Sequence, residues 1–176
     1  MRLRPATKDD LGYIRSLAGR RENWAFLTDE DDAALALYLS EPSSNLLIWD
    51  AVCDADRPLG YALFCDLGMP GRVVELRRLC LDQPGQGDGA EFLQALIDHA
   101  FVDYSASRLW LDCSDVNLRA LHVYNRAGFT QEGRLRAHDY IPKLGSYVDA
   151  VLFGMLRDEW QALGRRSGLA ACPPDA

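Results

Sequence analysis

The sequence predicts an α/β fold in a single domain. Three observations support this: strand-like and helix-like patterns alternate along the chain, an apolar strand at 73–82 leads through a glycine-rich loop into a helix, and a second strand and helix follow at 107–128. The length of 176 residues suits one domain that buries roughly two thirds of its unfolded surface. We expect this domain to span residues 1–163. The tail 164–176 lacks periodicity and is expected to be disordered.

The first helices are predicted from their caps. Thr7 and Asp10 have capping-box spacing ahead of a helix, and Thr28 and Asp31 repeat that spacing ahead of a second helix that ends near Leu39. Apolar or alternating runs predict seven strands, at residues 2–6, 45–53, 59–65, 73–82, 107–113, 129–139 and 146–157.

The loop after the fourth strand has glycine at every second position: Gly85, Gly87 and Gly89. A helix follows at once, with an apolar stripe formed by Phe92, Leu93, Leu96, Ile97, Ala100 and Phe101. Glycines let the backbone approach a ligand, and the first N–H groups of a helix lack intrahelical partners, so the junction suits a phosphate. Packing alone also produces such turns.

A second motif follows the fifth strand. Asn117 suits a helix N-cap, and Gly128 suits the left-handed position beyond the helix end. Between them Ala120, Leu121 and Tyr124 share one face of the helix, because they are three and four residues apart.

Together, in this order and spacing, the two motifs resemble those of the GNAT superfamily of acyl-CoA-dependent N-acyltransferases. The second family motif, Asn-x-x-Ala-x-x-x-Tyr-x-x-x-Gly-Phe, matches residues 117–129 at every fixed position. The resemblance covers about residues 1–160. It implies a GNAT-like mixed, mostly antiparallel central sheet of about seven strands flanked by helices, with a cofactor cleft between strands four and five.

The resemblance also implies acetyl-CoA as the acyl donor. The implied cofactor-binding residues are Leu79, Cys80 and Leu81 on the fourth strand, Gln86, Gly87, Asp88, Gly89 and Ala90 in the loop, and Asn117, Ala120 and Tyr124 on the later helix. Pro84 stands where the family usually has Gln or Arg, and the Asp88 carboxylate would repel phosphates unless it turns away or pairs with an Arg. We therefore expect weakened rather than abolished cofactor binding.

Tyr124 is the predicted general acid, because a phenol with an ordinary pKa of about 10 is protonated at pH 7 and can give its proton to a thiolate. The alternative is a tyrosine that only packs on the buried face of its helix. Glu75 is the predicted general base, with an ion pair to Arg77 or Arg78 as the alternative, and Asp112 is a weaker candidate. Strand alternation places Glu75 and Arg77 on one face together with Leu79 unless a bulge intervenes.

The acceptor is less defined. Trp24 lies where the family covers the acceptor mouth, although it could equally pack between helices. The C-terminal run resembles the branch that includes ribosomal-protein N-terminal alanine and serine acetyltransferases. That branch also includes enzymes of polyamines and antibiotics, so the acceptor is a primary amine on a small molecule or a protein N-terminus. Cys80 is expected to pack as a small apolar residue rather than act as a nucleophile, so transfer is direct.

Charge and cysteine content narrow the partners. A net charge of −7 and a pI near 4.9 disfavour nucleic acid and anionic membranes; the charge could favour a cationic acceptor or merely provide solubility. Five cysteines without Cys-x-x-Cys spacing predict reduced thiols in a cytoplasmic protein, and three scattered histidines predict no metal site. We expect a monomer or homodimer.

Two function classes follow. The first is an acetyl-CoA-dependent N-acetyltransferase. The second is a catalytically silent acyl-CoA-binding sensor or interaction module, which Pro84 and Asp88 favour and which Asn117 and Tyr124 oppose. A dinucleotide-binding site is a weak third, since residues 85–89 do not have Gly-x-Gly-x-x-Gly spacing.

Overall fold

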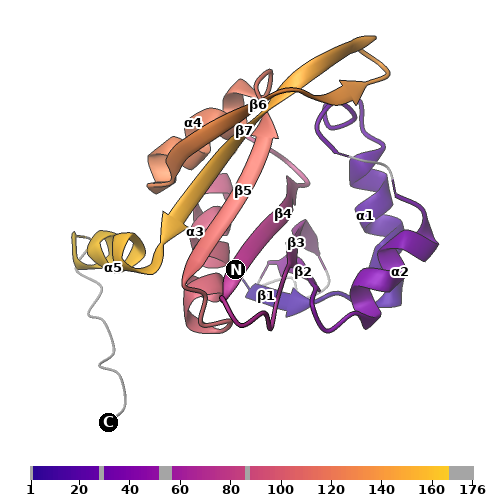
Figure 1. The fold of residues 1–176 in the computed structure, drawn as a ribbon. Helices are drawn as coiled ribbons and strands as arrows, with labels where there is room; N and C mark the ends of the chain where they lie inside the picture. The colour runs from indigo at the N-terminus through magenta and orange to yellow at the C-terminus, as the bar shows by residue number, and fades with distance from the viewer. Residues whose placement is uncertain (1, 28–29, 52–56, 86–87, 167–176) are drawn as a thin grey trace.

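The computed structural model describes residues 2–27, 30–51, 57–85 and 88–166 (Figure 1). Within these residues the strands form one sheet in the order β1-β2-β3-β4-β5-β7-β6, and each neighbouring pair is antiparallel except β4 with β5. The strands are β1 (Arg2–Pro5), β2 (Asn45–Asp50), β3 (Pro58–Cys65), β4 (Val73–Leu81), β5 (Arg108–Ser114), β6 (Thr130–Ile141) and β7 (Ser146–Leu156). This confirms the predicted mixed, mostly antiparallel sheet.

Helices cover both faces of the sheet (Figure 1). On one face, α1 (Leu11–Ala18) and α2 (Asp32–Ser40) pack their buried leucines and isoleucine on β2 and β3. On the other, α3 (Asp88–Val102) buries the whole predicted apolar stripe, and α4 (Leu118–Ala127) and α5 (Arg157–Arg166) join the same core. The sheet therefore separates two hydrophobic clusters.

The helix caps are confirmed in part. The Asp10 carboxylate accepts from the Thr7 backbone N–H (2.7 Å) and from its hydroxyl (3.0 Å), and a short 3₁₀ turn, Lys8–Asp10, leads into α1. At α2, Asp31 is the N-cap, and its side chain accepts from the Ala34 N–H at 2.8 Å. The second helix therefore starts at Asp32, directly after its cap. The predicted cap at Thr28 lies outside the described residues.

The C-terminal helix was missed. A strand to residue 157 and a tail from 164 were predicted, but β7 ends at Leu156 and α5 continues to Arg166. Tertiary contacts hold this polar segment: the Trp160 ring stacks on Phe101 at 5.1 Å, and its indole N–H donates to Asp98 at 2.7 Å. A helix that is held by a few such contacts lacks the continuous apolar stripe from which a helix is predicted in the sequence.

Candidate active site

The main cleft of the described chain opens where β4 and β5 separate. The two strands pair only at their starts, Val73–Glu75 with Arg108–Trp110. Beyond Glu75, β4 keeps β3 as its partner, but no strand of the described residues pairs with it on the β5 side. Backbone groups on this edge can bind an extended ligand. A cavity of about 900 Å³ lies here, lined by both strands, α3 and α4. The predicted cleft between strands four and five is therefore present.

One end of the cavity is the start of α3. Pro84, Gly85, Gly89 and Ala90 line it, and Gly85 has φ +101°, a conformation that favours glycine. The first N–H groups of a 15-residue helix lie at this end, so it suits an anionic group such as a pyrophosphate. Asp88 begins the helix but is not among the cavity residues. Gln86 and Gly87 lie outside the described residues.

Helix α4 supplies the opposite wall. The Asn117 side-chain oxygen accepts from the Ala120 N–H at 3.2 Å, and Gly128 ends the helix at φ 95°, so both predicted caps are confirmed. Asn117, Ala120 and Tyr124 all line the cavity. Asn117 is thus a cap that also faces the cleft.

Tyr124 both packs and faces the cavity. Its ring lies 5.6 Å from the Phe153 ring and 6.1 Å from the Phe129 ring, in edge-on geometry. Burial raises the pKa of its phenol above the ordinary value, with smaller contributions from Cys113 and Asp112. Within the described residues no group hydrogen-bonds to the hydroxyl, which therefore remains protonated and available to a ligand.

A β-bulge in β4 changes which side chains share a face. Leu63 pairs with Arg78 but Phe64 pairs with Leu76, so Arg77 has no partner in β3. Leu76 and Leu79 consequently contact the same core. The exception stated for the shared face of Glu75, Arg77 and Leu79 therefore applies, and Glu75 and Leu79 lie on opposite faces.

Glu75 is buried beside this bulge, only 6% exposed, and its carboxylate accepts from the Arg77 guanidinium at 2.5 Å. It is not among the cavity residues, whereas Arg77 is. Arg78 pairs instead with Glu30 at 2.9 Å. The structure thus has the ion pair that was the alternative to catalysis, and the role of Glu75 as a base stays a prediction.

Asp112 lines the cavity from β5 and is exposed to solvent. Partial burial by the cleft walls raises its pKa, and so do the negative charges of Asp139 and Glu75, while His138 and Arg77 oppose the rise. Among the described residues it has no hydrogen-bond or ion-pair partner.

Leu79, Cys80 and Leu81, the predicted cofactor-binding residues of β4, line the cavity. The Cys80 thiol is buried, receives a hydrogen bond from the Asn23 amide at 3.5 Å, and has its pKa raised by burial to about 12. A thiol in this state is protonated and a poor nucleophile, which agrees with a packing role.

The segment between α1 and α2 closes the far end. Glu22, Asn23, Phe26 and Leu27 line the cavity. Trp24 does not line it; the Lys143 ammonium lies 5.0 Å from its ring centroid. Lys143 stands in the turn of the β6–β7 hairpin, which projects toward this segment (Figure 1). The hairpin and the segment therefore meet beside the cleft.

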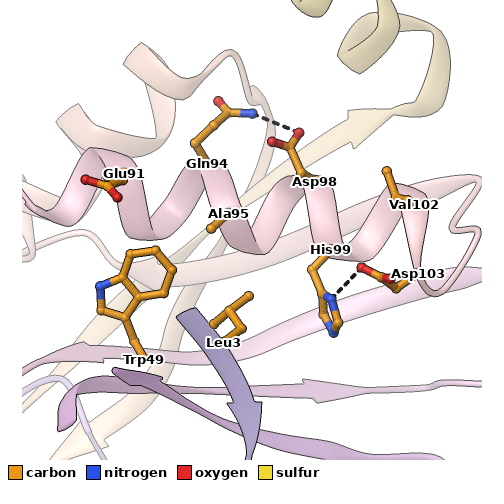
Figure 2. A pocket seen from close by; sticks show the side chains of 9 residues that line it. All are labelled: Leu3, Trp49, Glu91, Gln94, Ala95, Asp98, His99, Val102 and Asp103. Atoms are coloured by element: carbon orange, nitrogen blue, oxygen red, sulfur yellow. Dashed lines mark hydrogen bonds and ion pairs between the residues drawn. The ribbon is translucent and has the colours of Figure 1, made fainter. Parts of the chain in front are cut away.

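A second hollow of about 620 Å³ lies between α3 and the strands β1 and β2, where Leu3 and Trp49 face the helix (Figure 2). Its polar groups are largely satisfied: Asp98 accepts from Gln94 and Trp160, and Asp103 bonds His99 at 2.6 Å. No residue of β4 lines it, and neither do Gly89 and Ala90 of the glycine-rich turn, so the cleft is the better candidate site.

Within the described ranges, no group of three His, Cys, Asp or Glu side chains could hold a metal ion. The helices in this part of the chain are also too short or too polar to cross a membrane. Cys65, Cys80 and Cys113 are buried free thiols.

Comparisons with known proteins agree with this geometry. Residues 1–130 match the family described as "Acetyltransferase (GNAT) domain". The spermidine N(1)-acetyltransferase of Escherichia coli K12 is 22% identical over 184 residues, covering 100% of this chain and 96% of that protein. The spermine/spermidine N(1)-acetyltransferase of Bacillus subtilis is 30% identical over 134 residues, covering 62% and 88%.

Among solved structures, spermidine N-acetyltransferase from Vibrio cholerae in complex with CoA and spermine superposes with a TM-score of 0.81 at 19% identity, over 91% of this chain and 97% of that one. This likeness supports the fold. The family match spans most of the chain, including both walls of the cleft up to Phe129. The chain therefore belongs to the GNAT acetyltransferase family and is an N-acetyltransferase.

Proposed function

We propose that this enzyme transfers an acetyl group directly from acetyl-CoA to a primary amine of a small polycationic molecule, of the polyamine class. The relatives that cover most of the chain are named as polyamine acetyltransferases. The cavity lining includes the carboxylates of Glu22 and Asp112, and the chain has a net charge of −7. The observation that carries the proposal is the cleft itself. The unpaired edge of β4, the N-terminus of α3 and Tyr124 all line this one cavity.

The cofactor fits the residues present. Backbone groups of Leu79–Leu81 would bind the pantetheine arm, and the N–H groups at Gly89 and Ala90 would bind the pyrophosphate. Gln86 and Gly87 stay predicted contacts, and Asp88 contributes through its backbone rather than its carboxylate. Asn117 and Ala120 line the same cavity from α4.

Bound acetyl-CoA supplies the thioester that the amine attacks. Tyr124 is the proton donor to the departing thiolate, because its phenol is protonated, faces the cavity and has no competing partner in the described chain. Cys80 forms no covalent intermediate, since burial keeps its thiol protonated.

The resemblance to the ribosomal-protein branch has no counterpart in the relatives named above, so a protein N-terminus is the competing acceptor rather than the proposed one. The silent binding module is the competing class. The monomer or homodimer and the cytoplasmic location stay predictions.

The test is release of CoA thiol from acetyl-CoA, with the protein's own thiols blanked. The acceptors are spermidine, spermine, the polycationic aminoglycoside kanamycin, a monoamine and peptides with N-terminal Ala or Ser. We expect turnover with the polycations at kcat/KM at least tenfold above the peptides. Preference for the peptides would overturn the proposed acceptor. CoA binding without turnover on any acceptor would support the silent module.

A further inference from the structure

We propose that Asp112, rather than Glu75, takes the proton that the acceptor amine loses before it attacks the thioester. This inference rests on the proposed function. It follows from which carboxylate can reach the cavity, and it assigns Glu75 a positioning role that acts through Asp112.

The two carboxylates differ in access. Asp112 is exposed, lines the same cavity as Tyr124, and has no hydrogen-bond or ion-pair partner in the described chain. Glu75 is buried, does not line the cavity, and already accepts from Arg77. A base must come within hydrogen-bond reach of its proton, directly or through one water, so only Asp112 meets the geometric requirement without rearrangement.

The surroundings of Asp112 come from three neighbouring elements. Glu75 and Arg77 act from β4, and His138 and Asp139 act from β6. Tyr124 on α4 and Cys113, the next residue on β5, are neutral. Burial raises the pKa of both groups, and the charge of Asp112 adds to the rise. Burial by the cleft walls raises the pKa of Asp112, and so do the negative charges of Asp139 and Glu75. Arg77, which bonds Glu75, opposes the rise. A raised pKa makes a carboxylate a stronger base for an ammonium group.

A second bulge places the β6 neighbours. Between Leu135 and Asp139 the register with β7 shifts, and Ala137 adopts φ +50°, unusual for a residue with a side chain. The Asp149 carboxylate accepts from the Ala137 N–H at 2.8 Å and thereby fixes this conformation. Asp139 and His138 follow directly on β6, on the far side of β7 from β5; the charge of Asp139 raises the pKa of Asp112, and His138 lowers it.

The proton count is balanced. Asp112 takes one proton from the ammonium group, and the free amine forms the C–N bond to the acetyl carbon as the C–S bond breaks. Tyr124 gives its proton to the thiolate sulfur and regains the one that the nitrogen loses as the amide forms. Asp112 then releases its proton to water, so the reaction yields amide, CoA thiol and one proton.

The test is the pH profile of kcat/KM for Asp112→Asn and Glu75→Gln, with spermidine as acceptor. Asp115→Asn is the matched control, because Asp115 follows on the same segment but bonds Arg134 and is not a cavity residue. We expect Asp112→Asn to lose about 10²-fold or more at pH 7, within the range for one positioned base. An aromatic amine, already neutral at pH 7, should show a much smaller loss. Asp115→Asn should stay near wild type with both.

Glu75→Gln tests for a shift of the pH profile, which a merely structural role of Glu75 would not produce. Removing a negative neighbour lowers the pKa of Asp112, so the acidic limb of the profile should move to lower pH while the plateau largely persists. Asp112→Asn activity within twofold of wild type, or equal losses with the neutral and the ammonium acceptor, would overturn the assignment. Wild-type turnover of spermidine tests the proposed function. The activity of Asp112→Asn relative to wild type tests the assignment of Asp112 separately.

Discussion

Tyr124→Phe separates chemistry from packing. The substitution keeps the ring and its contacts with Phe153 and Phe129, and removes a hydroxyl that has no hydrogen-bond partner in the described chain. The free energy of unfolding should therefore change by less than about 1 kcal/mol, since no hydrogen bond is lost. The loss of a positioned acid should lower kcat about 10²–10⁴-fold, which is about 2.7–5.4 kcal/mol of barrier.

The matched control is Tyr104→Phe. The Tyr104 hydroxyl accepts from the Asn45 amide at 2.8 Å and bonds His99 at 3.0 Å, away from the cleft. Its removal should cost about 1 kcal/mol of stability per hydrogen bond and leave kcat unchanged.

The assay measures kcat at saturating acetyl-CoA with an acceptor that the wild type turns over, CoA affinity by calorimetry, and unfolding in urea. The account requires a large fall in kcat with nearly unchanged CoA affinity for Tyr124→Phe only. Turnover within twofold of wild type would show that Tyr124 packs and does not donate the proton.

Three further changes test other parts of the structure. Gly89→Val should weaken CoA binding about tenfold or more, because even a Cβ there lies 3.3 Å from Leu81 and the side chain blocks the backbone's approach; Gly12→Ala, with open space, should bind normally by calorimetry. Gly128→Ala should cost about 1–3 kcal/mol in urea unfolding, because φ is 95° and the new Cβ would lie 2.5 Å from Leu163; Gly145→Ala, also left-handed but uncrowded, should cost less. The Arg4 guanidinium holds the pKa of Asp10 at about 2, below its ordinary 3.8, so its stabilising contribution is present above pH 4 and is lost as the pH falls toward 2. Asp10→Asn should flatten that part of the stability curve, and an unchanged slope would refute the pairing.

The fold was largely predictable because its signals are local. The α3 stripe, the Asn117 cap and the left-handed Gly128 each depend on residues close in sequence, and all three are present. The helix at Arg157–Arg166 was not predictable in the same way, because Phe101 and Asp98, which hold Trp160, are far away in the sequence.

The candidate site was predictable in its cofactor half and less so in its acceptor half. The motifs identify Gly89, Asn117 and Tyr124 directly, and the structure brings them to one cavity. The face of β4 on which Glu75 lies depends on a bulge at Arg77. No residue pattern predicts this bulge, because the register of β4 is set by its pairing with β3. The raised pKa of Asp112 depends on its burial and on the charges of Asp139 and Glu75, which come near it only in the folded sheet.

The central claim, acetyl transfer to a small polycationic amine, is tested most directly by competition in one vessel. The wild-type enzyme would receive acetyl-CoA with equal concentrations of spermidine and a peptide with a free N-terminal alanine, and mass spectrometry would follow both products. The account predicts that acetylspermidine forms about tenfold faster than the acetylated peptide, or faster still, as expected from the ratio of kcat/KM. Acetylated peptide accumulating ahead of acetylspermidine would contradict it.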